Sequence, residues 1–291
     1  MEFDWYKKYK KLAREKWHKE FNLWKMMYLG MIDCVKKMAI NRGTEEEEFN
    51  PFSKLFLNFF LEVPKARISG KPIIMYPFNY GPELFHAMGL QPLMQEIFSV
   101  GLAPFHLNEP YLDITNEIEY GDNPTLCNAQ RPLIGSYFKK VAPIPDLLFY
   151  LATPCNSLAT TYQVFHHLSK VPTYSIDIPY WNYLDKNSEF YDEETLNYVI
   201  KQLKSLILWI EKETNHKLER DKFQQTMIWL NQCREYIMEF HELLRAVPCP
   251  VKSMVPFGNF LITVTKGGTK EAVDATKYIQ DTALENVKNK I

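Results

Sequence analysis

The sequence predicts an α/β protein in which helices flank a parallel sheet, with a Rossmann-like or flavodoxin-like topology. Two short apolar segments, residues 147–151 and 173–178, lie on either side of a helical segment at 157–169. A strand, a crossover helix and a second strand form the unit from which parallel sheets are built. Hydrophobic residues make up 46% of the 291 positions, which is enough for a core between such layers.

Composition excludes several classes of protein. The net charge is -1, so no overall field draws the chain to nucleic acid or to an anionic membrane. No apolar run reaches the roughly 18 residues of a membrane span, and residues 1–11 lack the apolar core of a secretion signal. We therefore expect a cytoplasmic protein that binds neither nucleic acid nor membrane. Five cysteines do not suit a disulfide framework, so we expect free or metal-bound thiols.

Apolar periodicity predicts the elements of the N-terminal half. Aromatic residues recurring every three or four positions predict one long helix over 4–41, with Cys34 beside its apolar stripe. Four consecutive acids at 45–48 follow as a break in the pattern. The next elements are expected as a strand at 71–77, a helix at 83–89, a helix at 92–100, a strand at 103–107 and a helix at 132–140.

The C-terminal half reads as mostly helical. Amphipathic helices are predicted at 192–214 and 218–245, followed by a strand at 254–265 and a last helix at 270–287. Cys233 lies on the apolar face of the second of these helices, so we expect it in the core. The predicted parts are an N-terminal helical segment (1–50), an α/β domain with the ligand cysteines (51–190), a helical hairpin (191–247) and the beginning of a second α/β domain (248–291), expected to continue beyond residue 291.

Two cysteines lie in loops next to predicted elements of the sheet. Cys155 follows the strand at 147–151, and Cys127 precedes the helix at 132–140. Open parallel sheets bind ligands outside the carboxyl ends of their strands, so a thiol there is placed for chemistry or for a metal. The two lie 28 positions apart (155 minus 127). Zinc ribbons need close pairs such as C-x2-C, whereas iron–sulfur clusters take thiolates from separate segments.

Other residues leave their interpretation open. Glu83 opens the helix at 83–89 and is either a first-turn acid that complements the helix dipole or a functional acid. His86, on the same helix face, is either structural or half of a metal pair. A cysteine hydrolase or transferase that uses one of the chain's histidines is a third class of function. The basic residues nearest to the cysteines are candidates for phosphate contacts or for solvated surface: Arg131, Lys139 and Lys140.

Four motifs in series resemble the 2-hydroxyacyl-CoA dehydratase family, which also contains the benzoyl-CoA reductase subunits. They run in that family's order, with motif detail over residues 70–180. The motifs are Tyr80-Gly-Pro-Glu83-Leu-Phe-His-Ala-Met-Gly-Leu-Gln-Pro92, Cys127-Asn-Ala-Gln-Arg131, Pro145-Asp146-Leu-Leu-Phe-Tyr-Leu-Ala-Thr-Pro-Cys155 and Val171-Pro-Thr-Tyr-Ser-Ile-Asp177-Ile-Pro179.

The resemblance implies a cofactor and a site. Members of the family carry a [4Fe-4S] cluster on three cysteines, with one iron open to substrate or solvent. Cys127 and Cys155 match the first two ligand positions, and Glu83 matches an acid that lines the active site. The family's third cysteine lies well downstream. The chain is therefore either a piece of a longer subunit whose third ligand is expected beyond residue 291, or a protein that uses the two cysteines with another ligand, or an accessory subunit. Within this chain the remaining candidates are Cys233, which reads as core, and Cys249, which lies in a turn between two prolines.

The resemblance also implies a reaction and partners. We expect a subunit of an oxygen-sensitive acyl-CoA enzyme of anaerobic metabolism, a lyase that dehydrates an (R)-2-hydroxyacyl-CoA through a ketyl radical after one-electron activation. Reduction of an aromatic ring, as in benzoyl-CoA reductase, is one alternative, and a non-catalytic subunit without a cluster is another. The implied partners are a homologous second subunit in a heterodimer, an ATP-dependent iron–sulfur activator protein and the acyl-CoA substrate.

Overall fold

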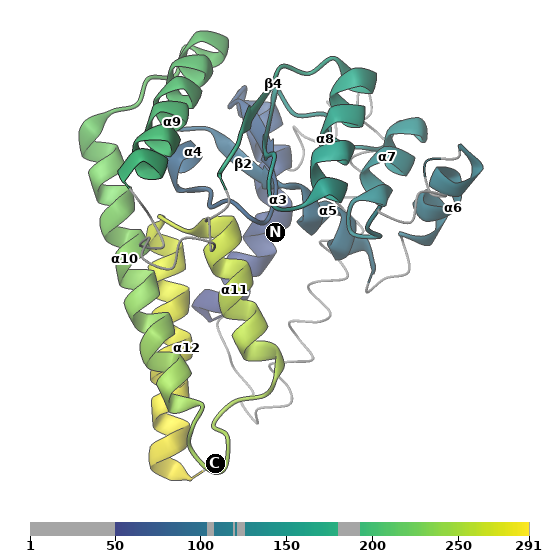
Figure 1. Ribbon diagram of the computed structural model, residues 1–291. Coiled ribbons are helices and arrows are strands. Elements are labelled where there is room, and N and C mark those ends of the chain that lie inside the picture. The colour runs from purple at the N-terminus through teal and green to yellow at the C-terminus, as the bar shows by residue number, and fades with distance from the viewer. Residues whose placement is uncertain (1–49, 104–107, 119, 121–125, 180–192, 291) are drawn as a thin grey trace. The chain divides into compact units, whose positions relative to one another are not determined.

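A computed structural model of the chain describes residues 50–103, 108–118, 120, 126–179 and 193–290 (Figure 1). The helix expected at 4–41, with Cys34, and most of the strand expected at 103–107 lie outside these residues. Contacts divide the chain into two compact units. The α/β unit contains Ile74–Tyr80 and Met94–Leu218, and the helical unit contains Gly81–Leu93, the described residues up to Ile73 and those from Glu219 onward.

A four-stranded sheet confirms the predicted fold class. Its order is β2-β1-β3-β4, and β3 runs parallel to both of its neighbours, with Ile74 opposite Leu147 and Leu148 opposite Thr173. Every residue of β1 and β3 is buried, as expected of strands covered on both faces. The strands are β1 (Ile73–Tyr76), β2 (Gln91–Met94), β3 (Leu147–Leu151) and β4 (Thr173–Ile176).

Helices surround the strands of the α/β unit, and most match the periodicity of the sequence. One prediction there is wrong in part, because the helix expected at 92–100 begins as strand β2 and turns helical only at Gln95. Pro92 is tolerated because β2 lies at the edge of the sheet, where a missing N–H costs least. The helices are α5 (Gln95–Leu102), α6 (Glu109–Glu117), α7 (Arg131–Phe138), α8 (Asn156–Ser169) and α9 (Glu193–Thr214).

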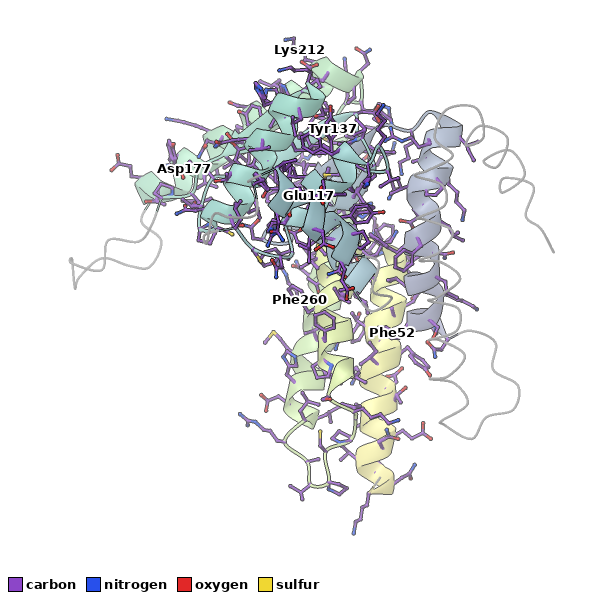
Figure 2. The ribbon with its side chains drawn as sticks, turned by 90° about the vertical axis from the view of Figure 1, so that its right-hand side faces the viewer. Phe52, Glu117, Tyr137, Asp177, Lys212 and Phe260 are labelled. Carbon is purple, nitrogen blue, oxygen red and sulfur yellow. The ribbon has the colours of Figure 1, made fainter. Side chains whose placement is uncertain are left out.

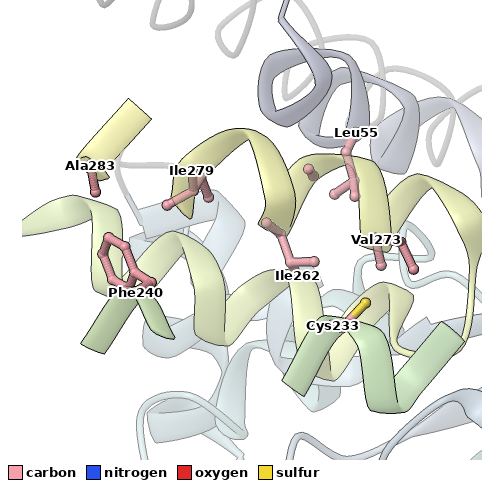
Figure 3. Packing of buried hydrophobic residues seen from close by; sticks show 9 residues of the cluster. Leu55, Cys233, Phe240, Ile262, Val273, Ile279 and Ala283 are labelled. Carbon is pink, nitrogen blue, oxygen red and sulfur yellow. The ribbon is translucent and has the colours of Figure 1, made fainter. Parts of the chain in front are cut away.

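The helical unit has its own core, formed by α3, α10, α11 and α12 (Figure 3). Cys233 is fully buried there beside Ile262 and Val273, so its prediction as a core residue is confirmed. Thr269 caps α12 by accepting the Ala272 N–H through its hydroxyl oxygen. The helices are α3 (Pro51–Ser69), α4 (Glu83–Ala87), α10 (Arg220–Leu243), α11 (Met254–Lys266) and α12 (Lys270–Asn289).

The strand predicted at 254–265 is wrong, because this segment is helix α11. Its β-branched residues suggested a strand, but its buried positions recur with helical spacing at Gly258, Asn259, Ile262 and Thr265. Burial against the neighbouring helices therefore outweighs the β-propensity of the segment. Within the part of the chain that the structure describes, no helix is long and apolar enough to cross a membrane.

Candidate functional site

Cys155 lies where strand β3 passes into helix α8, as the sequence predicted. It occupies the N-cap position of α8 with an extended backbone (φ -108°, ψ 104°). Its half-buried Sγ accepts the N–H of Leu158 at 3.4 Å, so the thiol takes the place of the hydroxyl or carboxylate that usually caps a helix. This puts a sulfur atom at the carboxyl end of a central parallel strand.

Cys127 is brought to the same helix end by a hydrogen bond over 30 positions. Its backbone N–H donates to Oγ of Ser157 at 2.7 Å, and Ser157 is in the first turn of α8, two residues after Cys155. The Cys127 side chain is exposed, and its Sγ accepts the N–H of Ala129 at 3.4 Å. The structure thus joins the two cysteine segments at the N-terminus of α8.

The segment 127–131, which we call the Cys127 loop, is fixed by helix α5 as well. Gln95 Nε2 donates to the carbonyl oxygen of Ala129 at 3.3 Å. Gln130 Nε2 donates to Oε1 of Glu96 at 2.7 Å. The loop therefore has a defined geometry without any bound group.

Arg131 ends the Cys127 loop and ties it to helix α6. Its Nη1 donates to Oδ1 of Asn128 at 2.9 Å, and its Nε donates to Oγ1 of Thr115 at 3.2 Å. Its Nη2 donates to the Leu112 carbonyl and to Oδ1 of Asn116. Because these donors are already engaged, Arg131 acts as a structural clamp rather than as a free phosphate contact. No hydrogen bond or ion pair in the described structure gives Lys139 or Lys140 a comparable role.

Sequence reasoning missed Glu96, whose carboxyl group is the most buried acid of the α/β unit's polar interior. The residue is 6% exposed, and its Oε2 accepts the Phe78 N–H at 3.0 Å while Oε1 accepts from Gln130. Burial raises its pKa to about 7, against the hydrogen bonds from Gln130 and Phe78 that favour the charged form. In the sequence its one signal was an acid between the apolar pairs 93–94 and 97–98.

Three polar atoms in the interior of the α/β unit have no partner among the described residues, and two of them belong to residues that interact with Glu96. They are Oη of Tyr162 and the side-chain carbonyl oxygens of Gln95 and Gln130, all buried. Burial raises the pKa of Tyr162 well above its usual value, and the nearby carboxyl of Glu96 adds to that shift. Buried polar groups normally find a partner in protein or in ordered water, so this interior suits water or a polar ligand.

Glu83 belongs to the helical unit, where it opens helix α4. Burial raises its pKa, and the positive charge of Arg234 opposes that shift. A Cβ on Gly81 would lie 2.0 Å from Oε2 of Glu83, so the carboxyl group folds back over that glycine. A Cβ on Gly268, whose φ is +82°, would lie 3.1 Å from Cβ of Glu83 and 2.5 Å from Cγ2 of Thr226. Glu83 is therefore packed rather than a solvated first-turn acid.

His86, one turn after Glu83, is a neutral histidine. Burial lowers its pKa to about 3, and the positive charges of Lys266 and Lys71 act in the same direction, against a hydrogen bond with the Thr265 backbone. Its Nε2 is buried and has no partner among the described residues. Across these residues, no group of three or more His, Cys, Asp or Glu side chains is arranged to hold a metal ion.

Asp177, a residue of the last of the four motifs, directly follows strand β4 (Figure 2). Its backbone N–H donates to Oε1 of Gln202 at 2.9 Å, and Gln202 Nε2 donates back to the Asp177 carbonyl. Its carboxylate accepts a hydrogen bond from the hydroxyl of Thr153 at 3.5 Å. The residue thus ties strand β4 to helix α9 through its main chain, and its exposed side chain has no defined ligand role.

The cysteines of the α/β unit suit the family's cluster in their chemistry. Both sulfur atoms accept a backbone N–H, and hydrogen bonds to sulfur are a main way in which proteins tune iron–sulfur clusters. Two thiols do not complete the set of three, and no third ligand joins them among the described residues. Cys233 is buried, and burial raises its thiol pKa to about 11, so it packs as core. Cys249 is exposed in the helical unit, with its Sγ 3.5 Å from the Val251 carbonyl oxygen.

Comparison with known proteins identifies the family. Residues 77–291 match the family model described as 2-hydroxyglutaryl-CoA dehydratase, D-component. The chain is 25% identical over 155 residues to the (R)-phenyllactyl-CoA dehydratase alpha subunit of Clostridium sporogenes, which covers 53% of this chain and 37% of that subunit. It is 24% identical over 152 residues to (R)-2-hydroxyglutaryl-CoA dehydratase, subunit alpha, of Acidaminococcus fermentans, which covers 52% of this chain and 31% of the relative.

These matches confirm the resemblance that the four motifs indicated, and they span well under half the length of the relatives. The match to the family model covers most of the chain and includes Glu83, Cys127 and Cys155. The chain therefore belongs to the 2-hydroxyglutaryl-CoA dehydratase D-component family.

Proposed function

We propose that this chain is a cluster-binding subunit of an enzyme that dehydrates 2-hydroxyacyl-CoA thioesters. The observation that carries the proposal is the hydrogen bond from the Cys127 N–H to Ser157, which joins the two family cysteines at one helix end. The family match and the names of the relatives, both dehydratase alpha subunits, support the reaction class. The finer proposal is radical dehydration through a ketyl radical, after one-electron activation by an ATP-dependent iron–sulfur protein.

The proposed cofactor is a [4Fe-4S] cluster with Cys127 and Cys155 as two of its ligands. When bound, such a cluster supplies one-electron transfer and an open iron that acts as a Lewis acid. The third protein ligand is expected outside the described residues. The backbone N–H groups of Ala129 and Leu158 would remain on the two sulfur atoms and stabilise them as thiolates.

Proton transfer in this proposal belongs to a carboxyl group of the chain. Glu96 lies in the same unit as the cysteines and is bonded to Gln130 of the Cys127 loop. With a pKa of about 7 it can both hold and release a proton near neutral pH, as a general acid or base requires. Glu83, the acid that matches the family motif, stays a second candidate because burial raises its pKa as well.

The test is an oxygen-free dehydration assay of the chain with its partner subunit, the activator and ATP. We expect turnover of an (R)-2-hydroxyacyl-CoA to be lost in Cys127→Ser and Cys155→Ser and kept in the control Cys249→Ser. Glu96→Gln should lower turnover by about 100-fold, the usual contribution of a general acid or base. Full activity in both cysteine variants would contradict the proposal.

A second candidate function is a non-catalytic partner subunit without a cluster. It is favoured by one observation, that no third ligand joins the two thiols among the described residues. In that case Cys127→Ala and Cys155→Ala would leave the activity of the assembled enzyme unchanged. Reduction of an aromatic acyl-CoA is the alternative reaction, and the same assay with an aromatic thioester would reveal it. In all three cases we propose a homologous second subunit as the partner, since both relatives are named alpha subunits.

A further inference from the structure

We propose that Ser157 is the positioning residue that sets the spacing between the thiols of Cys127 and Cys155. The inference rests on the proposed role of these two cysteines as ligands of one group. It assigns to Ser157 a task that belongs neither to a ligand nor to an ordinary helix cap.

Ser157 is fixed by the helix that Cys155 begins. Cys155 caps α8 through its own Sγ, so the helix does not use the Ser157 hydroxyl to cap its first turn. The side chain is instead directed to a separate segment, the Cys127 loop. Since both residues belong to the start of one helix, the positions of Cys155 and of Ser157 Oγ are set by the same rigid element.

The contact between Ser157 and the Cys127 loop is short, and its acceptor belongs to a buried residue. Oγ of Ser157 accepts the Cys127 N–H at 2.7 Å, at the short end of the range for N–H···O bonds. Ser157 is 6% exposed, so water cannot readily replace the hydroxyl if it is removed. Without that acceptor the N–H loses its partner inside the protein, and the loop would shift to satisfy it. Because the N–H belongs to Cys127 itself, that shift would move the ligand residue directly.

The other contacts of the Cys127 loop do not duplicate this one. Gln95 and Glu96 tie Ala129 and Gln130 to α5, and Arg131 ties the end of the loop to α6, so all of these contacts come after the cysteine. Only Ser157 joins the cysteine's own backbone to α8 among the hydrogen bonds of the described residues. Loss of Ser157 would therefore leave the loop attached but free to move relative to Cys155.

The hydroxyl also keeps an unused hydrogen. A serine hydroxyl accepts through its lone pairs and donates one hydrogen, and here only the accepting contact is made within the described residues. The donor is located between the two cysteine segments. A sulfur atom of a bound group is an acceptor for it, and this would add to the two backbone N–H donors already on the thiols.

The experiment uses phenylarsine oxide, which binds by bridging two close thiols, on the reduced cluster-free chain. We expect the wild type to bind the arsenical, Cys127→Ser and Cys155→Ser to lose this binding, and Ser157→Ala to weaken it about tenfold, the effect of one lost buried hydrogen bond. Ser136→Ala is the matched control, because Ser136 is a buried serine whose hydroxyl bonds only within its own helix, to the Leu133 carbonyl. It should bind like the wild type.

A second pair of variants separates the effect of losing the hydroxyl from a general loss of folding. Ser157→Thr and Ser157→Val have nearly the same shape and differ in the hydroxyl, so only the threonine variant should keep the wild-type affinity. Equal affinity in threonine and valine variants, no bridging in the wild type, or an equal loss in Ser136→Ala would each overturn the inference. The assay needs no iron, so a chain that never takes up a cluster would refute the proposed function and leave this result standing.

Discussion

The two sites that the sequence indicated differ in how accessible their functional side chains are. At the N-terminus of α8, two accessible or half-buried thiols lie on a backbone that Ser157 and Gln95 hold in place. At α4, two titratable side chains, Glu83 and His86, are shaped by burial, which raises the pKa of the first and lowers that of the second. The first arrangement leaves two thiols available on a fixed backbone, whereas the second encloses its two titratable side chains in packed surroundings.

The largest effect we expect in the α/β unit is the pH dependence of stability that Glu96 causes. Its folded pKa, about 7, lies above the ordinary value of 4.5, so the folded state binds the proton more tightly. The stabilisation that this proton binding gives to the folded state is therefore fully present below pH 4.5 and is lost as the pH rises through 7. The loss amounts to about 3 kcal/mol in the free energy of unfolding. Glu96→Gln should remove this slope when urea unfolding is measured at pH 4.5, 6 and 8.

The control is Glu117→Gln, an exposed carboxyl at the end of α6, which should keep the wild-type slope (Figure 2). An unchanged slope of stability against pH in Glu96→Gln would show that this carboxyl group is solvated. Glu96 would then not be a buried acid comparable with Glu83.

Removal of the Arg131 clamp tests whether the Cys127 loop is held by its contacts. Arg131→Met keeps the length of the side chain but removes donors to Asn128, Thr115 and Asn116. We expect the free energy of unfolding to fall by about 2 kcal/mol, because the two partly buried acceptors of Arg131, the Thr115 hydroxyl and the Leu112 carbonyl, lose their partner. Chemical denaturation gives the value, and exposed Lys139→Met should stay within about 0.5 kcal/mol of the wild type. Equal losses of stability in Arg131→Met and Lys139→Met would mean that the hydrogen bonds of Arg131 do not stabilise the protein.

The packing around Glu83 can be tested at Gly268. Gly268→Ala forces a side chain into a left-handed backbone (φ +82°) and against Thr226 and Glu83, so we expect a loss of about 2 kcal/mol. Gly70→Ala has a similar φ of +72° but meets nothing within 4 Å, and it isolates the backbone strain, about 1 kcal/mol. Thermal unfolding of the two variants should separate them. Identical losses would show that Glu83 is not tightly packed.

The smallest effect we expect is the opposite pH dependence of His86. Its folded pKa, about 3, lies below the ordinary 6.5, so the unfolded chain binds the proton more tightly between these values. Stability should therefore fall as the pH falls from 6.5 to 5, by about 1 to 2 kcal/mol. His86→Gln should flatten this part of the profile, whereas the exposed His167→Gln should not. A profile that keeps its slope in His86→Gln would assign the effect to another group.

Local signals predicted most of the fold, and tertiary burial decided the rest. The β3–α8–β4 unit was predictable because each segment carries its own apolar pattern and the Thr153-Pro154 turn separates strand from helix. Helix α11 was not, because Gly258 and Asn259 on its buried face hide the helical period. Helix α3 was given no prediction, and its internal Pro64 weakens any helical reading.

The same division holds for the candidate site. Cys127 and Cys155 were found because their motifs and strand-end position are visible in the sequence. Glu96 and Ser157 were missed, since their importance lies in contacts with residues 18 to 34 positions away. Burial of an acid and pairing of a hydroxyl with a distant N–H are properties of the folded chain, and no local pattern encodes them.

The central claim is that Cys127 and Cys155 hold one iron–sulfur cluster, and the most direct test is a joint measurement of iron, acid-labile sulfide and Mössbauer spectra. The protein is purified without oxygen as wild type, Cys127→Ser, Cys155→Ser and the control Cys249→Ser. We predict about four iron and four sulfide per chain in the wild type and the control, and loss of both in the two site variants. A wild type that stays free of iron after reconstitution, or site variants that keep their full iron content, would contradict the claim.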